Sequence, residues 1–238
     1  MNKSQKMLRF VFLAMMVAIG VVISPILRVE GMCPMAHFIN VTCAVLLGPW
    51  DALICATTIG IIRMLTMGIP PLALTGAVFG AFLSGMLYRL SKGKIVFAFL
   101  GEVIGTGIIG AIVSYPVMTY IVGREDLSAF FYVPSFTAGT LIGGTLAFLF
   151  LKQLQKGKLL SKFQTSLGSN VYEGGNVVLN DALGIAFFGF IGYLVTVVIV
   201  NSFITNAPEF VHMIKYIVLV FFFVAAIVYW FLNREKRA

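Results

Sequence analysis

Residues 95–121 read IVFAFLGEVIGTGIIGAIVSYPVMTYI, and Glu102 is the single charged residue in that run. A helix needs about 20 mostly apolar residues to cross a bilayer, so this run is long enough to span it. The whole sequence has the same character, because 60% of its 238 residues are hydrophobic and 11% are charged. Soluble domains carry charges on about a quarter of their residues. The sequence therefore predicts an all-α integral membrane protein.

Further apolar runs predict a multi-span protein with three parts. Residues 1–152 are expected to form a six-span membrane domain, residues 153–181 a cytoplasmic linker, and residues 182–238 a transmembrane hairpin with a basic tail. The linker is polar and contains several Lys, Ser and Gly residues, and an interfacial helix is expected at its start. The predicted spans are about residues 8–26, 34–48, 50–67, 71–90, 95–121, 132–151, 182–204 and 211–232.

The basic residues indicate how the chain crosses the membrane. Lys and Arg near short loops stay cytoplasmic, and with the N-terminus inside, most of the 17 basic residues fall on that side. Arg28 and Arg124 fall outside, Lys215 near the outer end of the last span, and Arg63 within the membrane. We therefore predict a multi-pass protein of the cell membrane with both termini cytoplasmic. The net charge of +8 is then an orientation signal, and no nucleic-acid partner is predicted.

Small residues recur at four-residue spacing, which in lipid lets helix backbones approach closely. The run GTGIIG at 105–110 belongs to this pattern although it matches G-x-G-x-x-G. A dinucleotide site needs a strand before the glycines and an acidic residue about 20 residues further on, whereas this run lies within a span. No P-loop motif is present, so no nucleotide hydrolysis is assigned to this chain. The small-residue pairs are Ala14/Ala18, Gly76/Gly80, Gly101/Gly105 and Gly139/Gly143.

Polar residues inside the predicted spans are the candidate site, because each costs a few kcal/mol at mid-bilayer unless it faces protein or water. His37 and Asn40 are three residues apart and so share one helix face. With Arg63 and Tyr115 they fall in the outer half of the membrane, whereas Glu102 falls toward the inner side. This distribution predicts a polar-lined cavity open to the exterior. Bland alternatives stay open: an interfacial histidine, an arginine that snorkels, a structural glutamate and a tyrosine of the aromatic belt.

An ordered set of motifs resembles a known family. PMAHFIN at 34–40, LLGPW at 46–50, Arg63, GEVIGTGIIGA at 101–111 and SYP at 114–116 resemble the substrate-binding S components of energy-coupling factor vitamin transporters. Within these, the ThiW type is most similar, and it is assigned to hydroxyethylthiazole, the thiazole precursor of thiamine. The likeness covers about residues 5–155.

The resemblance implies a six-helix bundle that captures a vitamin precursor from outside and delivers it inward. It implies two kinds of partner: a transmembrane coupling subunit and two cytosolic ATPase subunits. It also implies that Ala14 and Ala18 form the face on which the coupling subunit packs. The chain departs from the family in its C-terminal hairpin, since S components ordinarily end after six spans. The predicted fold is therefore an S-component-like bundle followed by an extra hairpin.

For the ligand we expect His37 and Asn40 to form hydrogen bonds, Tyr115 to stack or to offer its hydroxyl, and Arg63 and Ser135 to act as wall or gate. Glu102 is a further candidate despite its predicted depth. Thiazole, pyrimidine and intact thiamine all stay open as substrates.

Two other function classes compete with vitamin capture. A stand-alone ion-coupled carrier would use Glu102 as its titrating group. A membrane enzyme lacks residues for its chemistry, because the sequence shows no His-Glu metal cluster, no paired carboxylates and no Ser/His/Asp constellation. We therefore predict that the protein is not an enzyme and needs neither cofactor nor metal. Cys33, Cys43 and Cys55 show no C-x-x-C pairing and are expected to be packing residues.

Overall fold

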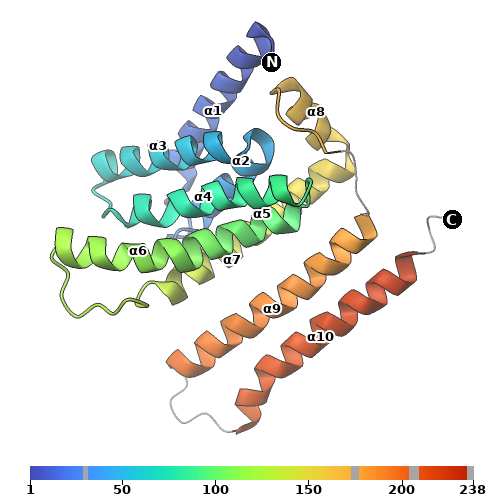
Figure 1. Ribbon diagram of the computed structural model, residues 1–238. Helices are drawn as coiled ribbons and strands as arrows, with labels where there is room; N and C mark the ends of the chain where they lie inside the picture. The colour runs from blue at the N-terminus through green and yellow to red at the C-terminus, as the bar shows by residue number, and fades with distance from the viewer. Residues whose placement is uncertain (29–31, 173–176, 204–208, 235–238) are drawn as a thin grey trace. The chain divides into compact units, whose positions relative to one another are not determined.

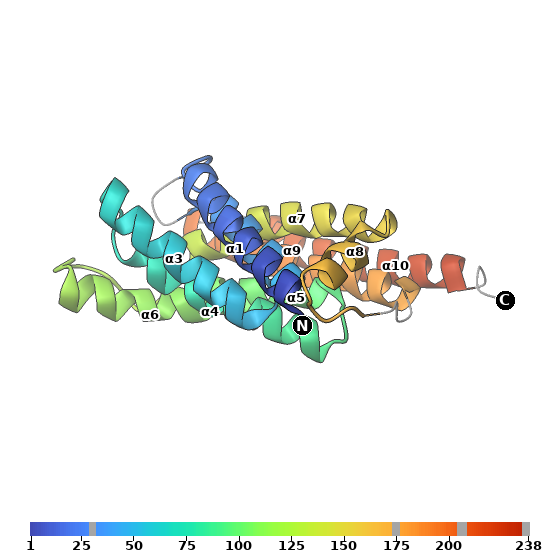
Figure 2. The same ribbon diagram turned by 90° about the horizontal axis from the view of Figure 1, so that it is seen from above.

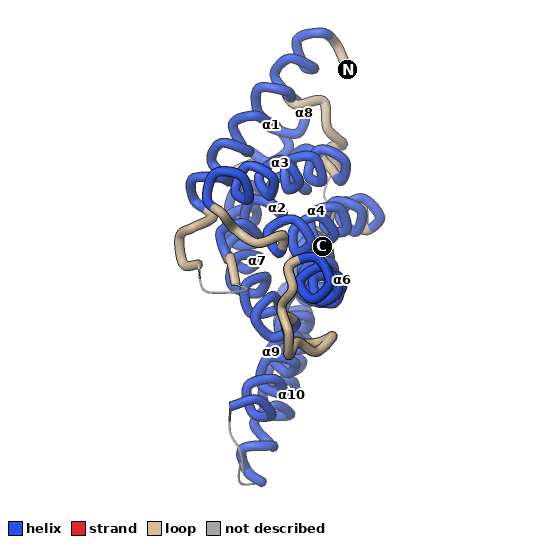
Figure 3. The backbone as a smooth tube through the Cα atoms, turned by 90° about the vertical axis from the view of Figure 1, so that its left-hand side faces the viewer, coloured by secondary structure: helices blue, strands red, loops and turns tan. Residues whose placement is uncertain are grey.

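The computed structural model describes residues 1–28, 32–172, 177–203 and 209–234 (Figure 1). Within these ranges the chain contains helices and loops and no β-strand (Figure 3). The chain divides into two compact units, Met1–Glu173 and Gly174–Ala238. Among the described residues, six helices are long and apolar enough to cross a membrane. The predicted all-α membrane fold is confirmed.

The first unit contains the bundle. Its helices are α1 (Lys3–Ile23), α2 (Pro34–Leu47), α3 (Pro49–Met67), α4 (Leu72–Leu90), a composite fifth helix and α7 (Val133–Lys156). The fifth helix runs without a break through α5 (Ile95–Glu102), the π-helical η1 (Val103–Gly110), α6 (Ala111–Pro116) and the π-helical η2 (Val117–Ile121). The single span predicted at 95–121 is therefore present, and it contains wider π turns that were not predicted. Such turns occur frequently at functional sites.

Helix α2 differs from the prediction of a full span at 34–48. It has 14 residues and is about 21 Å long at 1.5 Å per residue, short of the ~30 Å hydrocarbon core. It is instead the buried centre of the unit, in contact with α1, α3, α4, α5 and α7. It ends at Gly48, whose φ of +96° suits glycine, and α3 begins directly with Pro49. By contrast, α1 lies at the edge, against α2 and α3 (Figure 2).

Glycines bring α4 and the fifth helix into backbone contact. A Cβ atom added at Gly105 would lie 2.6 Å from the Gly80 Cα, and one added at Gly101 would lie 2.5 Å from the Ser84 nitrogen. Both distances are too short for any real side chain, so only glycine permits this approach. Figure 1 shows the two helices side by side. The interpretation of GTGIIG as a helix-packing run is confirmed.

The segment after α7 packs on the bundle. Helix α8 (Leu159–Ser166) carries Gln164, whose Nε2 donates to the Val45 carbonyl at 2.9 Å and to the Tyr88 hydroxyl at 3.0 Å. Part of the segment predicted as a linker over 153–181 thus belongs to the first unit, and the two units divide near its end.

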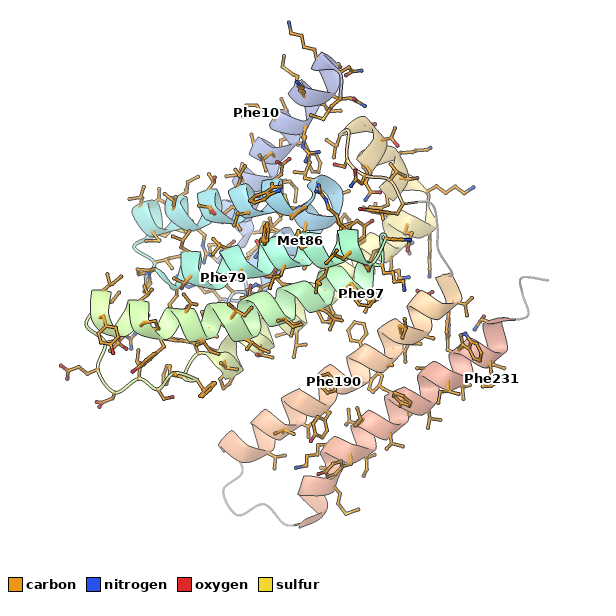
Figure 4. The ribbon with its side chains drawn as sticks, in the orientation of Figure 1. Phe10, Phe79, Met86, Phe97, Phe190 and Phe231 are labelled. Carbon is orange, nitrogen blue, oxygen red and sulfur yellow. The ribbon has the colours of Figure 1, made fainter. Side chains whose placement is uncertain are left out.

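The second unit is a hairpin of α9 (Val177–Phe203) and α10 (Glu209–Arg234), which lie side by side in Figure 1. The Tyr229 hydroxyl donates to Asp181 at 3.2 Å. Phe190 on α9 and Phe231 on α10 are exposed (Figure 4), as expected of residues that face lipid. The predicted extra hairpin is present, whereas its connecting residues 204–208 and the basic tail with Lys236 and Arg237 lie outside the described residues.

Candidate functional site

A cavity of about 430 Å³ opens in the first unit at the end of the bundle opposite the N-terminus. There α1 and α3 end, and α2, α4 and α7 begin. Its wall combines apolar side chains with a few polar ones, as ligand sites do. The lining residues are Arg28, Met32, Cys33, Ala36, His37, Arg63, Ile69, Pro70, Leu72, Ala73, Gly76, Ala77, Thr106 and Phe136.

A buried hydrogen-bond cluster, the Glu102 cluster, adjoins this cavity. It consists of His37, Asn40, Glu102 and Thr106, and all four side chains are buried. The Glu102 Oε1 atom lies 2.8 Å from His37 Nδ1, 3.0 Å from Asn40 Nδ2 and 3.1 Å from Thr106 Oγ1. Its second oxygen, Oε2, has no hydrogen-bond partner within the described part of the chain. The cluster therefore fixes two residues that line the cavity, His37 and Thr106.

The donors at Glu102 determine how His37 is oriented. Because Oε1 accepts from the Asn40 amide and from the Thr106 hydroxyl, we assign the hydrogen on His37 to Nδ1. The other ring nitrogen, Nε2, makes no hydrogen bond to any described residue. A fixed tautomer is what a ligand-binding histidine needs, since the second nitrogen then presents one defined hydrogen-bonding character.

Local sequence explains why these side chains meet. His37 and Asn40 share one face of α2 at i, i+3, and Glu102 and Thr106 share one face of the fifth helix at i, i+4. On the facing α4, a Cβ atom at Gly80 would lie 2.7 Å from Glu102 Oε2 and would overlap the Thr106 hydroxyl. Gly80 therefore provides the space in which the carboxylate sits.

Arg63 lines the cavity and is 3% exposed. Its Nη2 lies 3.3 Å from the Cys33 sulfur, and its Nε has no partner among the described residues. No Asp or Glu oxygen of the described ranges lies within ion-pair distance of it. The side chain is thus surrounded by protein and the cavity. Arg28, which is exposed, lines the same cavity.

The structure brings together four of the six predicted site residues. His37 and Arg63 line the cavity, and Asn40 and Glu102 lie in the cluster beside it. Glu102 was expected nearer the inner side than His37, whereas the two side chains lie in direct contact.

Tyr115 and Ser135 are not among the lining residues. Ser135 donates to the Tyr132 carbonyl at 3.1 Å. Beside Tyr115, the hydroxyl of Ser114 lies 2.6 Å from that of Thr75 and so joins the fifth helix to α4. The Ser135 hydroxyl is thus used within its own helix, and Tyr115 lies next to a residue that joins two helices.

Thr106 and Phe136 are among the lining residues that were not predicted. Thr106 lies inside GTGIIG and was attributed to helix packing, although its i, i+4 spacing from Glu102 was a readable signal. Phe136 follows Ser135 and contributes an aromatic wall. Among the described residues no group of His, Cys, Asp and Glu side chains could hold a metal ion. The arrangement is suited to binding a small ring compound with a few hydrogen-bonding atoms.

Comparison with known proteins identifies the family. Residues 10–157, more than half of the chain, match ThiW, described as a thiamine-precursor transporter protein. Searches of curated proteins and of solved structures gave no match. The matched range contains most of α1, the other helices of the bundle, the cavity and the Glu102 cluster. The chain therefore belongs to the ThiW family of thiamine-precursor transporters.

Proposed function

We propose that this membrane protein is the substrate-capture subunit of an energy-coupling factor importer, and that it binds hydroxyethylthiazole in the cavity beside the Glu102 cluster. The observation that carries the proposal is a cavity of about 430 Å³ within a matched thiamine-precursor transporter family. Small-molecule pockets range from about 300 to 1,000 Å³, so the cavity suits a single small heterocycle.

The side chains around the cavity suit both parts of such a ligand. Phe136, Leu72 and Ile69 offer apolar and aromatic surface to the ring. His37, through Nε2, and Thr106, through its hydroxyl oxygen, offer hydrogen-bond acceptors to the hydroxyl of the hydroxyethyl arm, and Asn40 and Glu102 hold them in position. The roles expected for Tyr115 and Ser135 stay predictions that rest on the family resemblance.

The coupling subunit is proposed to dock on α1. Ala14 and Ala18 lie on the exposed side of this helix, where a second helix could approach closely. Energy would come from two cytosolic ATPase subunits, consistent with a sequence that lacks a P-loop motif. Both termini would be cytoplasmic, as the basic residues predict, and the cavity would then open outward.

The test is binding of hydroxyethylthiazole to purified full-length protein by calorimetry. Wild-type protein is expected to bind one equivalent, and His37→Ala and Asn40→Ala are each expected to weaken binding by about tenfold or more, since a lost hydrogen bond in a desolvated site costs about 1–3 kcal/mol. Circular dichroism checks that each variant is folded. Absence of heat with hydroxyethylthiazole, in folded wild-type protein, would overturn the substrate assignment.

A second candidate is a stand-alone ion-coupled carrier, and Glu102 favours it. Its side chain is fully buried and one carboxylate oxygen has no partner among the described residues, as in a group that binds and releases a proton during transport. Uptake by liposomes that contain only this chain distinguishes the two. Uptake driven by a proton gradient without ATPase subunits would support the carrier and contradict the importer subunit.

A further inference from the structure

The cavity has a strongly positive lining. Arg63 is almost fully buried, and Arg28 lines the same cavity from an exposed position. No aspartate or glutamate of the described ranges is among the lining residues. Glu102, which lies in the cluster beside the cavity, accepts hydrogen bonds from three neighbours through Oε1. The charged side chains among the described lining residues are therefore both positive.

Arg63 has hydrogen-bond donors that the described residues do not use. An arginine side chain carries five N–H donors in a fixed fork. Within the described residues its only hydrogen-bond contact is the Cys33 sulfur at 3.3 Å, a weak acceptor, and its buried Nε has none. A buried guanidinium without a paired anion is costly. Such a group is suited to a ligand oxyanion, which it can hold through two parallel hydrogen bonds.

We propose that the cavity contains an anion subsite at Arg63, and that the preferred ligand is the anionic form of the small heterocycle, with a phosphate or carboxylate on its side arm. The inference rests on the proposed function, whose ligand is the neutral alcohol, and deepens it by naming the charge of the substrate class. Arg28 attracts the anion toward the cavity, and Arg63 binds it. The ring lies against Phe136.

The first test compares ligands of different charge on purified full-length protein by calorimetry. The ligands are hydroxyethylthiazole, its phosphate ester, the corresponding thiazole carboxylate and inorganic phosphate. Wild-type protein is expected to bind at least one of the two anionic heterocycles about tenfold more tightly than the alcohol, which corresponds to one good charge-assisted contact. Whichever of the phosphate ester and the carboxylate binds more tightly identifies the anionic group that the site prefers. Equal or tighter binding of the alcohol would overturn the proposal.

Single substitutions then show which residue is responsible for the preference for the anionic ligand over the alcohol. Arg63→Gln is expected to remove it, so that the ratio of anion to alcohol affinity falls to about one, and Arg63→Lys to retain part of it. Arg89→Gln, at the opposite end of α4, removes the same charge away from the cavity and should leave the ratio unchanged. Glu30 lies outside the described residues and near Arg28 in sequence, so Glu30→Gln is included, and it should not lower the ratio. A ratio unaffected by Arg63→Gln would overturn the proposal.

A second test needs no heterocycle and therefore separates this proposal from the proposed function. Cys33 lines the cavity next to Arg63, whereas Cys43 and Cys55 are fully buried. A negatively charged thiosulfonate reagent should modify Cys33 faster than a positively charged one of similar size, and Arg63→Gln should abolish the difference. Cys33→Ser is the labelling control. Faster reaction of the positive reagent would contradict an anion subsite even if every heterocycle binds, and a negative-reagent preference would support it even if none does.

Discussion

Arg9 and Arg63 lie at opposite ends of the bundle and are treated differently by the protein. Arg9 pairs with Asp51 at 2.5 Å and also donates to the Leu47 carbonyl and to the Ser169 hydroxyl. It thereby joins α1, the turn between α2 and α3, and the segment after α8. Arg63 is more deeply buried and, within the described residues, contacts only the Cys33 sulfur.

The contrast indicates that the Arg9 end stabilises the fold and that the Arg63 end is suited to binding a ligand. At the Arg9 end, donors are matched to acceptors within the chain, and α8 adds Gln164 to the same region. At the Arg63 end, the Nε atom of that arginine and one nitrogen of His37 lack partners among the described residues. Substitutions at the first end should change stability, and substitutions at the second should change binding.

The largest effect on binding is expected from Glu102→Ala. Three buried donors would lose their shared acceptor, at about 1–3 kcal/mol each, and His37 would lose its fixed orientation. Affinity for hydroxyethylthiazole, measured by calorimetry, should fall by more than about a hundredfold. Glu125→Ala, in an exposed loop, is the matched control. Wild-type affinity in Glu102→Ala would show that the cluster does not support the site.

A smaller loss is expected from Gly80→Ala. The added methyl group would overlap Thr106 and approach Glu102, so the cluster must shift, and affinity should fall by about tenfold. Gly157→Ala is the control, because a Cβ atom there would approach no atom closer than 3.6 Å. If both variants bind equally well by calorimetry, the space at Gly80 is not required.

At the other end, Arg9→Ala should lower stability and leave binding unchanged. It leaves Asp51 and the Leu47 carbonyl without this donor, which should reduce the free energy of unfolding by about 1–3 kcal/mol. Thermal unfolding in detergent measures the shift, with the exposed Lys3→Ala as control. If Arg9→Ala is as stable as wild type but binds the ligand more weakly, the assignment of stability to the Arg9 end and of binding to the Arg63 end is contradicted.

The smallest effects are expected from Tyr115→Phe and Ser135→Ala. Neither side chain lines the cavity, and each substitution removes only a hydroxyl, so affinity should change by less than about threefold, or under 1 kcal/mol. A tenfold loss in either variant, measured by the same titration, would show that the bound state recruits residues beyond the cavity lining.

Sequence alone predicted the spans because length and apolar content largely determine which segments lie in lipid. It misassigned α2 because burial by protein and burial by lipid favour the same residues, so hydropathy does not distinguish a short central helix from a span. The spacing of His37 and Asn40 correctly indicated one polar face.

The contact between His37 and Glu102 could not be predicted, since these residues are 65 positions apart and meet only through the packing of two helices. The π turns also change which residues of the fifth helix face inward. The sequence predicts Ser135 as a site residue, whereas its neighbour Phe136 lines the cavity. Each residue turns a helix by about 100°, and sequence does not fix the rotation of the helix about its axis.

Protection of Cys33 tests most directly whether the ligand occupies this cavity. Purified protein is treated with a neutral maleimide with and without saturating hydroxyethylthiazole, and the labelling rate of Cys33 is measured by mass spectrometry. Because Cys33 lines the cavity, bound ligand should slow its labelling several-fold, and Cys33→Ser should show no site to protect. A ligand that binds by calorimetry and leaves the Cys33 labelling rate unchanged would contradict binding in this cavity.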